Sequence, residues 1–366
     1  MGDAGAEVQV PIGVRARDGS RATLMWAGAA VESGEALTTS SDRVAQSAPS
    51  NDLRLQESVP VEDTTTDAVP RLPDANGWEQ YAPVDPPASP PHVSHETARQ
   101  MPAPARTRVM VVANQKGGVG KTTTAVNLAA ALAQGGLRVV VIDLDPQGNA
   151  STALGIDHSP GTPGTYEVLI SGAPIAAHLI ESPEAPGLRV LPATIDLAGA
   201  EIELVPVVAR ENRLLRAINT YLRTNEVDYV ILDCPPSLGL LTLNALVAAG
   251  EILIPIQCEY YALEGVSQLM RTIDLVQAEL NDRLTLSTVL LTMFDARTRL
   301  AAQVADEVRK HFAGQTLPTV IPRSVRISEA PSYGQTVLTY HPDSTGAISY
   351  REAAHEIARR GAKESA

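Results

Sequence analysis

A glycine-rich turn between an apolar strand and a helix most constrains the fold of this 366-residue chain. Residues 108–114 read RVMVVAN, an aliphatic run typical of a strand buried on both faces. QKGGVG follows, and KTTTAVNLAAALAQ then shows a helical pattern that stops at Gly135 and Gly136. This order predicts a phosphate-binding loop, because backbone N–H groups and the helix N-terminus both favour an anion there.

The loop departs from the usual phosphate-loop pattern, G-x-x-x-x-G-K-[ST]. Counting back from Gly120 and Lys121 places the first glycine at position 115, where the chain has Gln115. A second lysine, Lys116, stands beside it. The chain holds only four lysines against 25 arginines, so two lysines within six residues stand out from its background composition. Lys116 therefore needs a role of its own.

The expected nucleotide-binding residues of the loop form one run: Lys116, Gly117, Gly118, Val119, Gly120, Lys121, Thr122 and Thr123. We expect Lys121 to reach the β- and γ-phosphates and Thr122 to bind Mg²⁺. Two further apolar runs end in carboxylates. VVVIDLD ends in Asp143 and Asp145, and DYVILD ends in Asp233, which matches a Walker B strand and is expected to hold Mg²⁺.

The region after residue 105 alternates between strand and helix patterns, which predicts an α/β fold of the P-loop NTPase type. We expect a mostly parallel, twisted sheet with helices on both faces. The predicted strands are Arg108–Ala113, Arg138–Asp143, Tyr229–Asp233, Glu251–Ile256 and Leu284–Met293. The predicted helices are Lys121–Gln134, Leu238–Ala249, Tyr260–Leu280 and Arg299–Phe312.

The composition changes near residue 105. Residues 1–105 hold 12 of the 27 prolines and 15 acidic residues but no lysine. Such a segment buries too little apolar surface to offset its ordering entropy. We therefore predict a mostly disordered N-terminal tail over residues 1–105, with one short helix within residues 21–37, and an ATPase domain over residues 106–366.

Charge and cysteine content limit the classes of function. A net charge of −13 argues against coating of nucleic acid by the whole chain, but not against a local basic patch. Cys234 and Cys258 lie far apart in unlike contexts, which favours a reducing, cytoplasmic location over a disulfide framework. No run of 18 apolar residues and no signal-peptide pattern is present, so no membrane insertion is expected.

KGGVGKTTT resembles the deviant Walker A motif of the ParA/MinD family of P-loop ATPases. DLDPQGN (143–149), DART (295–298) and PRSVRISEAPSYG (322–334) extend the resemblance to the chromosomal ParA/Soj branch, over residues 107–360. The resemblance implies that Lys116 reaches across a dimer interface to the partner's ATP and that Asp145 orients the attacking water. With Lys121, these two residues form the expected catalytic set.

The same resemblance implies an adenine pocket that includes Pro322 and Ser324, although many relatives carry Asn where this chain has Ser324. It implies DNA contacts by Arg297 and Arg326, made to phosphates with little reading of bases.

The expected function is that of a DNA-partitioning ATPase with ATP and Mg²⁺ as cofactors. ATP drives a sandwich homodimer that binds nonspecific double-stranded DNA of the nucleoid, and a ParB-type centromere-binding partner stimulates hydrolysis and release during chromosome segregation.

Two other classes of protein remain as alternatives. A MinD-like membrane-cycling ATPase, which positions division or polar structures, needs a C-terminal amphipathic helix with bulky apolar residues. This chain has no large apolar residue after Ile357. A transcriptional regulator needs a fused helix-turn-helix, and the proline-rich tail shows no such pair of helices.

Overall fold

The computed structural model describes residues 12–15, 21–24, 100–259 and 262–363. The chain divides into two compact units, Met1–Ser94 and His95–Ala366. In the first unit, β1 (Ile12–Arg15) pairs antiparallel with β2 (Arg21–Leu24). The helix predicted within residues 21–37 is therefore wrong at its start, which is a strand. Residues 25–37, like most of the predicted disordered tail, lie outside the described residues.

The packed part of the second unit begins before residue 106. The side chain of Met101 is only 5% exposed, and its backbone N–H donates to the carbonyl oxygen of Gly135 at 2.9 Å. A Cβ on Gly135 would lie 2.6 Å from Cγ of Met101, so the close approach requires glycine at this position. Residues 100–105, assigned to the tail from their composition, thus include a segment that packs at the end of the first helix of this unit.

One eight-stranded sheet forms the centre of the second unit, in the order β10-β9-β8-β3-β7-β4-β6-β5. Neighbouring strands run parallel except β5, which pairs antiparallel with β6 at one edge. The strands are β3 (Arg108–Val112), β4 (Val139–Asp143), β5 (Ile180–Glu181), β6 (Leu188–Leu191), β7 (Tyr229–Asp233), β8 (Glu251–Gln257), β9 (Thr285–Phe294) and β10 (Thr316–Pro322).

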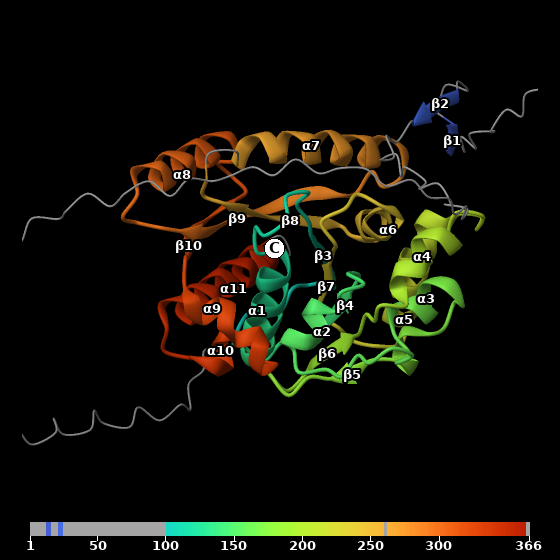
Figure 1. Cartoon of the computed structure of the whole chain (residues 1–366), viewed down its shortest axis with the longest axis horizontal. Helices are drawn as coiled ribbons and strands as arrows, with labels where there is room; N and C mark the ends of the chain where they lie inside the picture. The colour runs from blue at the N-terminus through green and yellow to red at the C-terminus, as the bar shows by residue number, and fades with distance from the viewer. Residues whose placement is uncertain (1–11, 16–20, 25–99, 260–261, 364–366) are drawn as a thin grey trace, which may run out of the picture. The chain divides into compact units, whose positions relative to one another are not determined.

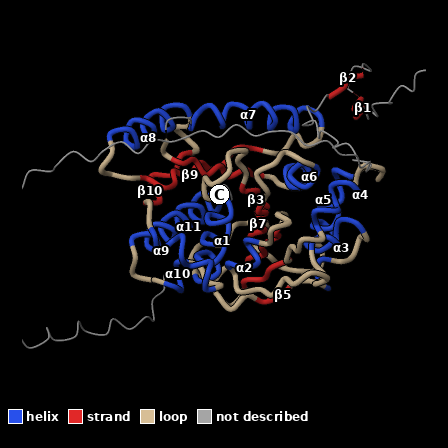
Figure 2. The backbone as a smooth tube through the Cα atoms, in the orientation of Figure 1, coloured by secondary structure: helices blue, strands red, loops and turns tan. Residues whose placement is uncertain are grey.

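Helices cover both faces of this sheet (Figures 1 and 2). Alternate residues of a strand face opposite sides: Val111 joins one core cluster, and Met110 and Val112 join the other. The first cluster takes in α3 (Thr165–Ile170), α4 (Leu197–Glu203), α5 (Arg213–Leu222), α6 (Leu240–Ala248), α7 (Ala262–Glu279) and α8 (Arg299–His311). The second takes in α1 (Lys121–Gln134), α2 (Asn149–Ala153), α9 (Val325–Glu329), α10 (Val337–Tyr340) and α11 (Thr345–Lys363).

This architecture confirms the predicted α/β class and the mostly parallel sheet. The five predicted strands and four predicted helices all occur, with ends within two residues of those expected. Among the described residues, none of the helices combines the length and the apolar character needed to cross a bilayer.

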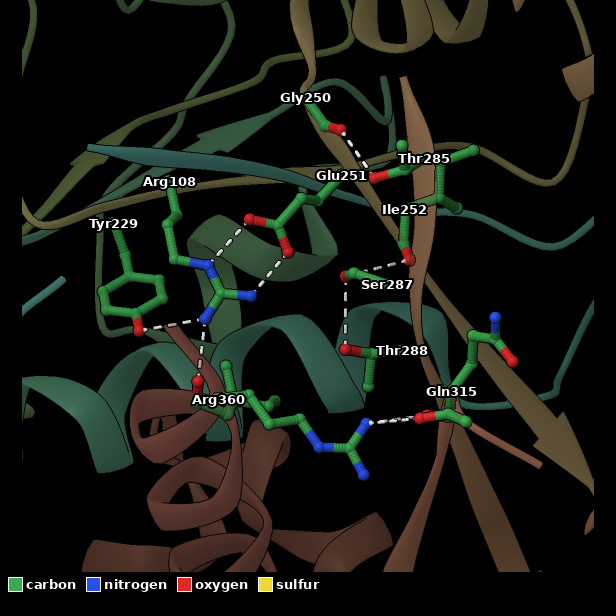
Figure 3. A network of polar contacts seen from close by, with 12 residues as sticks. Arg108, Tyr229, Gly250, Glu251, Ile252, Thr285, Ser287, Thr288, Gln315 and Arg360 are labelled. Atoms are coloured by element: carbon green, nitrogen blue, oxygen red, sulfur yellow. Dashed lines mark hydrogen bonds and ion pairs between the residues drawn. The ribbon is translucent and has the colours of Figure 1, made fainter. Parts of the chain in front are cut away.

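A buried guanidinium joins the strands at the amino end of the sheet to the C-terminal helix (Figure 3). Arg108 on β3 is 6% exposed and donates to both carboxylate oxygens of Glu251 on β8, at 2.7 and 2.5 Å. It also donates to the hydroxyl of Tyr229 on β7 at 3.2 Å and to the carbonyl oxygen of Ile357 on α11 at 2.7 Å. These contacts fix three neighbouring strands and α11 against one another.

We predict that Glu251→Gln lowers the free energy of unfolding by about 3 kcal/mol, because it leaves the buried Arg108 cation without its counter-charge. Urea denaturation followed by circular dichroism measures the change. Glu226→Gln is the matched control, since Glu226 pairs with Arg138 at an exposed position and should change stability little. Equal stability of the wild type and Glu251→Gln would show that the Arg108 network does not hold the strands together.

Candidate nucleotide-binding site

The carboxyl ends of three central strands meet at one edge of the sheet. In the parallel register, Val112 of β3 pairs with Asp233 of β7, which also pairs with Asp143 of β4. The loop of residues 113–120 leaves β3 at this edge and leads directly into α1. Register alone therefore brings the predicted phosphate loop and the strand-end carboxylates together, as expected for ligand sites in open α/β sheets.

A side chain of the loop and one from β9 fix the shape of the loop. Asn114 donates its Nδ2 hydrogen to the carbonyl oxygen of Pro255 at 2.8 Å and accepts from the backbone N–H of Lys116 at 3.0 Å. Thr292 on β9 donates to the carbonyl oxygen of Val119 at 2.9 Å. A Cβ on Gly118, whose φ is +73°, would meet nothing within 4 Å, so the side of the loop facing that position is open. A phosphate group can approach the backbone there.

Lys121 lies inside the curve of the loop. It is only 7% exposed, and its Nζ lies 3.4 Å from the carbonyl oxygen of Lys116. Burial lowers the pKa of its ammonium group, while the charges of Asp233 and Asp145 act in the opposite direction. A buried cation with one long hydrogen bond to protein is suited to pairing with a phosphate oxygen.

Asp233 is buried opposite this cation without a hydrogen-bond partner. The residue is 0% exposed, and both carboxylate oxygens lack a well-formed hydrogen bond. Burial raises its pKa well above the usual value and the charge of Asp143 raises it further, while the nearby hydroxyl of Thr122 opposes the shift. Buried polar atoms of this kind need a missing partner, and a carboxylate beside a hydroxyl is a donor set that Mg²⁺ accepts.

Asp143 and Asp145 have different surroundings. Asp143 is fully buried and accepts from the backbone N–H and the hydroxyl of Ser151, at 2.9 and 2.8 Å. Burial raises its pKa to about 6, although the Ser151 hydrogen bonds counteract the shift. Asp145 is 8% exposed and accepts from the backbone N–H of Gln147 at 3.0 Å. Asp143 therefore anchors the loop that carries Asp145, a role that the sequence pattern did not reveal.

Lys116 contacts a carboxylate that sequence reasoning missed. Its Nζ lies 3.6 Å from Oε2 of Glu259, two residues after the end of β8. Glu259 also accepts from Arg323 at 3.1 Å and from Gln257 at 2.6 Å. Glu259 thus connects the phosphate loop to the segment after β10. No local motif signals this contact, because it joins residues far apart in the chain.

The predicted adenine-contact residues lie at the end of β10, the edge strand that pairs with β9. Pro322 ends β10, and Ser324 precedes the first residue of α9. The backbone N–H of Arg323 donates to the carbonyl oxygen of Phe294 on β9 at 3.0 Å. The chain between Pro322 and Ser324 is thereby attached to β9, the strand whose Thr292 supports the phosphate loop.

The two predicted DNA-contact arginines are exposed and already ion-paired. The side chain of Arg297 is 87% exposed and donates to both carboxylate oxygens of Asp295, at 2.9 and 2.8 Å. These hydrogen bonds lower the pKa of Asp295 to about 2. Arg326 lies 3.3 Å from Glu329. Within the described residues, the structure places both arginines on the surface but partly neutralises each one.

Comparison with known proteins is consistent with this geometry. Residues 107–286 match a family model described as an AAA domain. The sporulation initiation inhibitor protein Soj of Bacillus subtilis is 52% identical over 254 residues, covering 69% of this chain and 99% of that protein. The chromosome partitioning protein ParA of Myxococcus xanthus is 51% identical over 258 residues, covering 70% of this chain and 90% of that protein.

This chain is also similar to a protein whose structure has been solved with bound nucleotide. That protein is named cobyrinic acid a,c-diamide synthase, from Mycobacterium smegmatis, and its crystal structure contains ADP and magnesium. It is 41% identical, has a TM-score of 0.60, and is matched over 70% of this chain and 95% of that chain.

A phosphate loop on a mostly parallel sheet, with a buried carboxylate at the end of the neighbouring strand, defines a P-loop ATPase of the ParA/MinD class. At the identity and coverage found, the chain belongs to the Soj/ParA family of chromosome-partitioning proteins. The family resemblance predicted from the loop and switch motifs is confirmed.

The raised pKa of Asp143 generates a prediction for the metal-free, nucleotide-free protein. Between pH 3.8, the ordinary pKa of an aspartate, and about pH 6, the folded state retains the Asp143 proton that the unfolded chain has released. The contribution of Asp143 to the free energy of unfolding should therefore fall as the pH rises through this window and then level off. Asp143→Asn should reduce the slope, since the amide has no proton to lose. Thermal unfolding in EDTA buffers tests this, and an identical slope in the variant would contradict it.

Proposed function

We propose that this protein is an ATP-dependent DNA-partitioning ATPase. The observation that carries the proposal is the pair formed by a buried lysine, Lys121, and a buried carboxylate without a hydrogen-bond partner, Asp233, at the mouth of a phosphate loop. ATP with Mg²⁺ satisfies both groups at once, since the phosphates pair with Lys121 and the metal takes the carboxylate.

Each residue of the site has a distinct part in holding ATP. The backbone N–H groups from Gly117 to Thr123 and the Lys121 ammonium bind the phosphate oxygens. The hydroxyl of Thr122 and the carboxylate of Asp233 hold Mg²⁺, which supplies neutralisation of phosphate charge. With two protein ligands, phosphate oxygens and waters would complete the Mg²⁺ shell.

Asp145 positions the attacking water. It is held at the edge of the site by the loop that Asp143 and Ser151 anchor, and 8% of its surface is exposed, which leaves room for a water molecule. In-line attack depends mainly on position and electrostatics, so a carboxylate that orients water is sufficient. Pro322 and Ser324 contact the adenine end of the nucleotide.

Lys116 acts in trans, on the ATP bound by a second copy of the chain. Its side chain is 36% exposed and its partner Glu259 is 45% exposed, so their ion pair contributes little to stability and exchanges readily for a phosphate. A cation supplied by a partner subunit stabilises charge on the transferring phosphoryl group, as an arginine finger does. ATP thereby drives formation of a sandwich homodimer.

The dimer binds nucleoid DNA without sequence preference, through Arg297 and Arg326 of both copies. A ParB-type partner stimulates hydrolysis and so releases the protein from DNA. The MinD-like alternative fits less well, because α11 packs its apolar residues Tyr350, Ala354 and Ile357 into the core, whereas a membrane-binding helix presents its apolar face to the bilayer.

We predict that Lys116→Ala binds ATP but stays monomeric, because the contact in trans is lost. Analytical ultracentrifugation with ATP and Mg²⁺ measures the dimer. Asp145→Ala is the matched control and should form the ATP dimer while releasing phosphate at least about tenfold more slowly. Unchanged dimerisation of Lys116→Ala would rule out its role in trans.

We predict that Arg297→Glu abolishes retention of DNA while ATP-dependent dimerisation stays intact. Asp295→Asn, which frees Arg297 from its ion pair, should bind DNA more tightly and with a steeper dependence on salt. Co-sedimentation with DNA of constant length and varied sequence, over a range of salt concentrations, measures both effects. DNA binding by Arg297→Glu equal to that of the wild type would place the DNA surface elsewhere.

A further inference from the structure

A cavity opens at the amino end of the sheet, at the opposite end of the strands from the phosphate loop. Its volume is about 790 Å³, which falls in the range of small-molecule sites, roughly 300–1,000 Å³. The first residues of three strands line it and are drawn in Figure 3, namely Arg108 of β3, Glu251 of β8 and Thr285 of β9. Side chains of α5, the end of α6 and residues 104–107 form further walls. This space is called the amino-end cavity here.

Polar contacts within the protein hold the walls of the amino-end cavity in place. Arg108 and Glu251 share the two hydrogen bonds described above. The Nδ2 group of Asn281 lies 2.7 to 3.1 Å from three carbonyl oxygens at the end of α6, and the hydroxyl of Thr285 donates to the carbonyl oxygen of Gly250 at 3.3 Å. The cavity is therefore built from fixed elements, as small-molecule sites usually are.

An aliphatic patch forms part of the wall. Leu215 and Leu222 lie seven positions apart on α5 and thus on the same side of that helix. Together with Val109 of β3 they pack against the first core cluster, yet each is only partly buried. The apolar surface that these side chains leave at the cavity favours a ligand with an apolar body, which would remove that surface from water.

Cations outnumber acids among the residues that line the cavity. They are Arg106, Arg108 and Arg283 against Glu251, a net charge of +2 (three minus one), in a chain whose net charge is −13. Arg108 and Glu251 neutralise each other. The side chains of Arg106 and Arg283 are exposed, and neither guanidinium group has a hydrogen bond or ion pair to another residue that the structure describes. Two cations thus remain for an anionic ligand.

We propose that the amino-end cavity binds a small amphipathic anion, a molecule with one carboxylate, sulfonate or phosphate group on an aliphatic or aromatic body. The acidic group pairs with the guanidinium groups of Arg106 and Arg283, and the body covers the aliphatic patch. A small cation fits less well, because the carboxylate in the described wall, that of Glu251, already accepts twice from Arg108. The inference goes beyond the proposed function, since this site lies apart from the phosphate loop.

Fluorescence titration of the full-length protein with anilinonaphthalene sulfonate tests the proposal. Phenylnaphthylamine, the same aromatic body without the sulfonate, is the matched neutral probe. We expect the anionic probe to bind saturably, one molecule per chain, and at least about tenfold more tightly than the neutral one, the gain expected from a charge-assisted hydrogen bond. Excess ADP with Mg²⁺ should not displace it, because the phosphate loop lies at the other end of the strands.

Removal of the two unpaired cations tests the charge at the rim. Arg106→Gln combined with Arg283→Gln should weaken the anionic probe about tenfold and leave the neutral probe unchanged. Arg216→Gln combined with Arg223→Gln is the matched control. It removes the same charge from exposed positions on and next to α5 that do not line the cavity, and it should change the affinity for neither probe.

Asn219→Phe tests the volume of the cavity. Asn219 is exposed and lines the cavity from α5, so a phenyl ring at this position takes up space that the ligand needs and should weaken both probes about tenfold. Equal affinity for the anionic probe in the wild type, the Arg106 and Arg283 double variant and Asn219→Phe would overturn the proposal. Displacement of the probe by ADP would also overturn it, because the probe would then occupy the nucleotide site.

Discussion

The buried carboxylate of Asp233 and the nearby buried ammonium of Lys121 are the two charges around which the nucleotide site is built. A carboxylate without hydrogen bonds in the interior is costly, and neutralisation by a raised pKa is the usual consequence. The raised pKa of Asp233 follows this rule. The neighbouring Asp143 reduces the same cost by accepting from Ser151. The fold therefore keeps one carboxylate satisfied as an anchor and leaves the other for a ligand.

The register of the parallel strands fixes the position of Asp233 in the site. A register slip of one residue in β7 would move Asp233 to the other face of the sheet. At the opposite edge, Arg108 joins β3, β7 and β8 to α11 through its contacts with Tyr229, Glu251 and Ile357. Polar groups thus act at both ends of the central strands. Those at the amino end hold the strands in place, and those at the carboxyl end form the site.

Local sequence signals were sufficient for the central strands and for α1. Tyr229–Asp233 is a continuous aliphatic run, and Lys121–Gln134 is bounded by glycines, so each segment determines its own element. Elements that depend on tertiary contacts were not predictable in this way. Strand β5 has only two residues and exists because β6 lies beside it. The contact between Lys116 and Glu259 joins loops 143 positions apart, and the burial of Met101 depends on a glycine at position 135.

The central claim is that Asp233 is a ligand of Mg²⁺ in the ATP complex. Isothermal titration calorimetry of ATP binding, with Mg²⁺ and in EDTA, tests it most directly in the wild type and in Asp233→Asn. We expect Mg²⁺ to tighten ATP binding to the wild type by at least about tenfold, and the variant to lose this gain while still binding ATP in EDTA. An equal gain from Mg²⁺ in both proteins would show that Asp233 does not bind the metal.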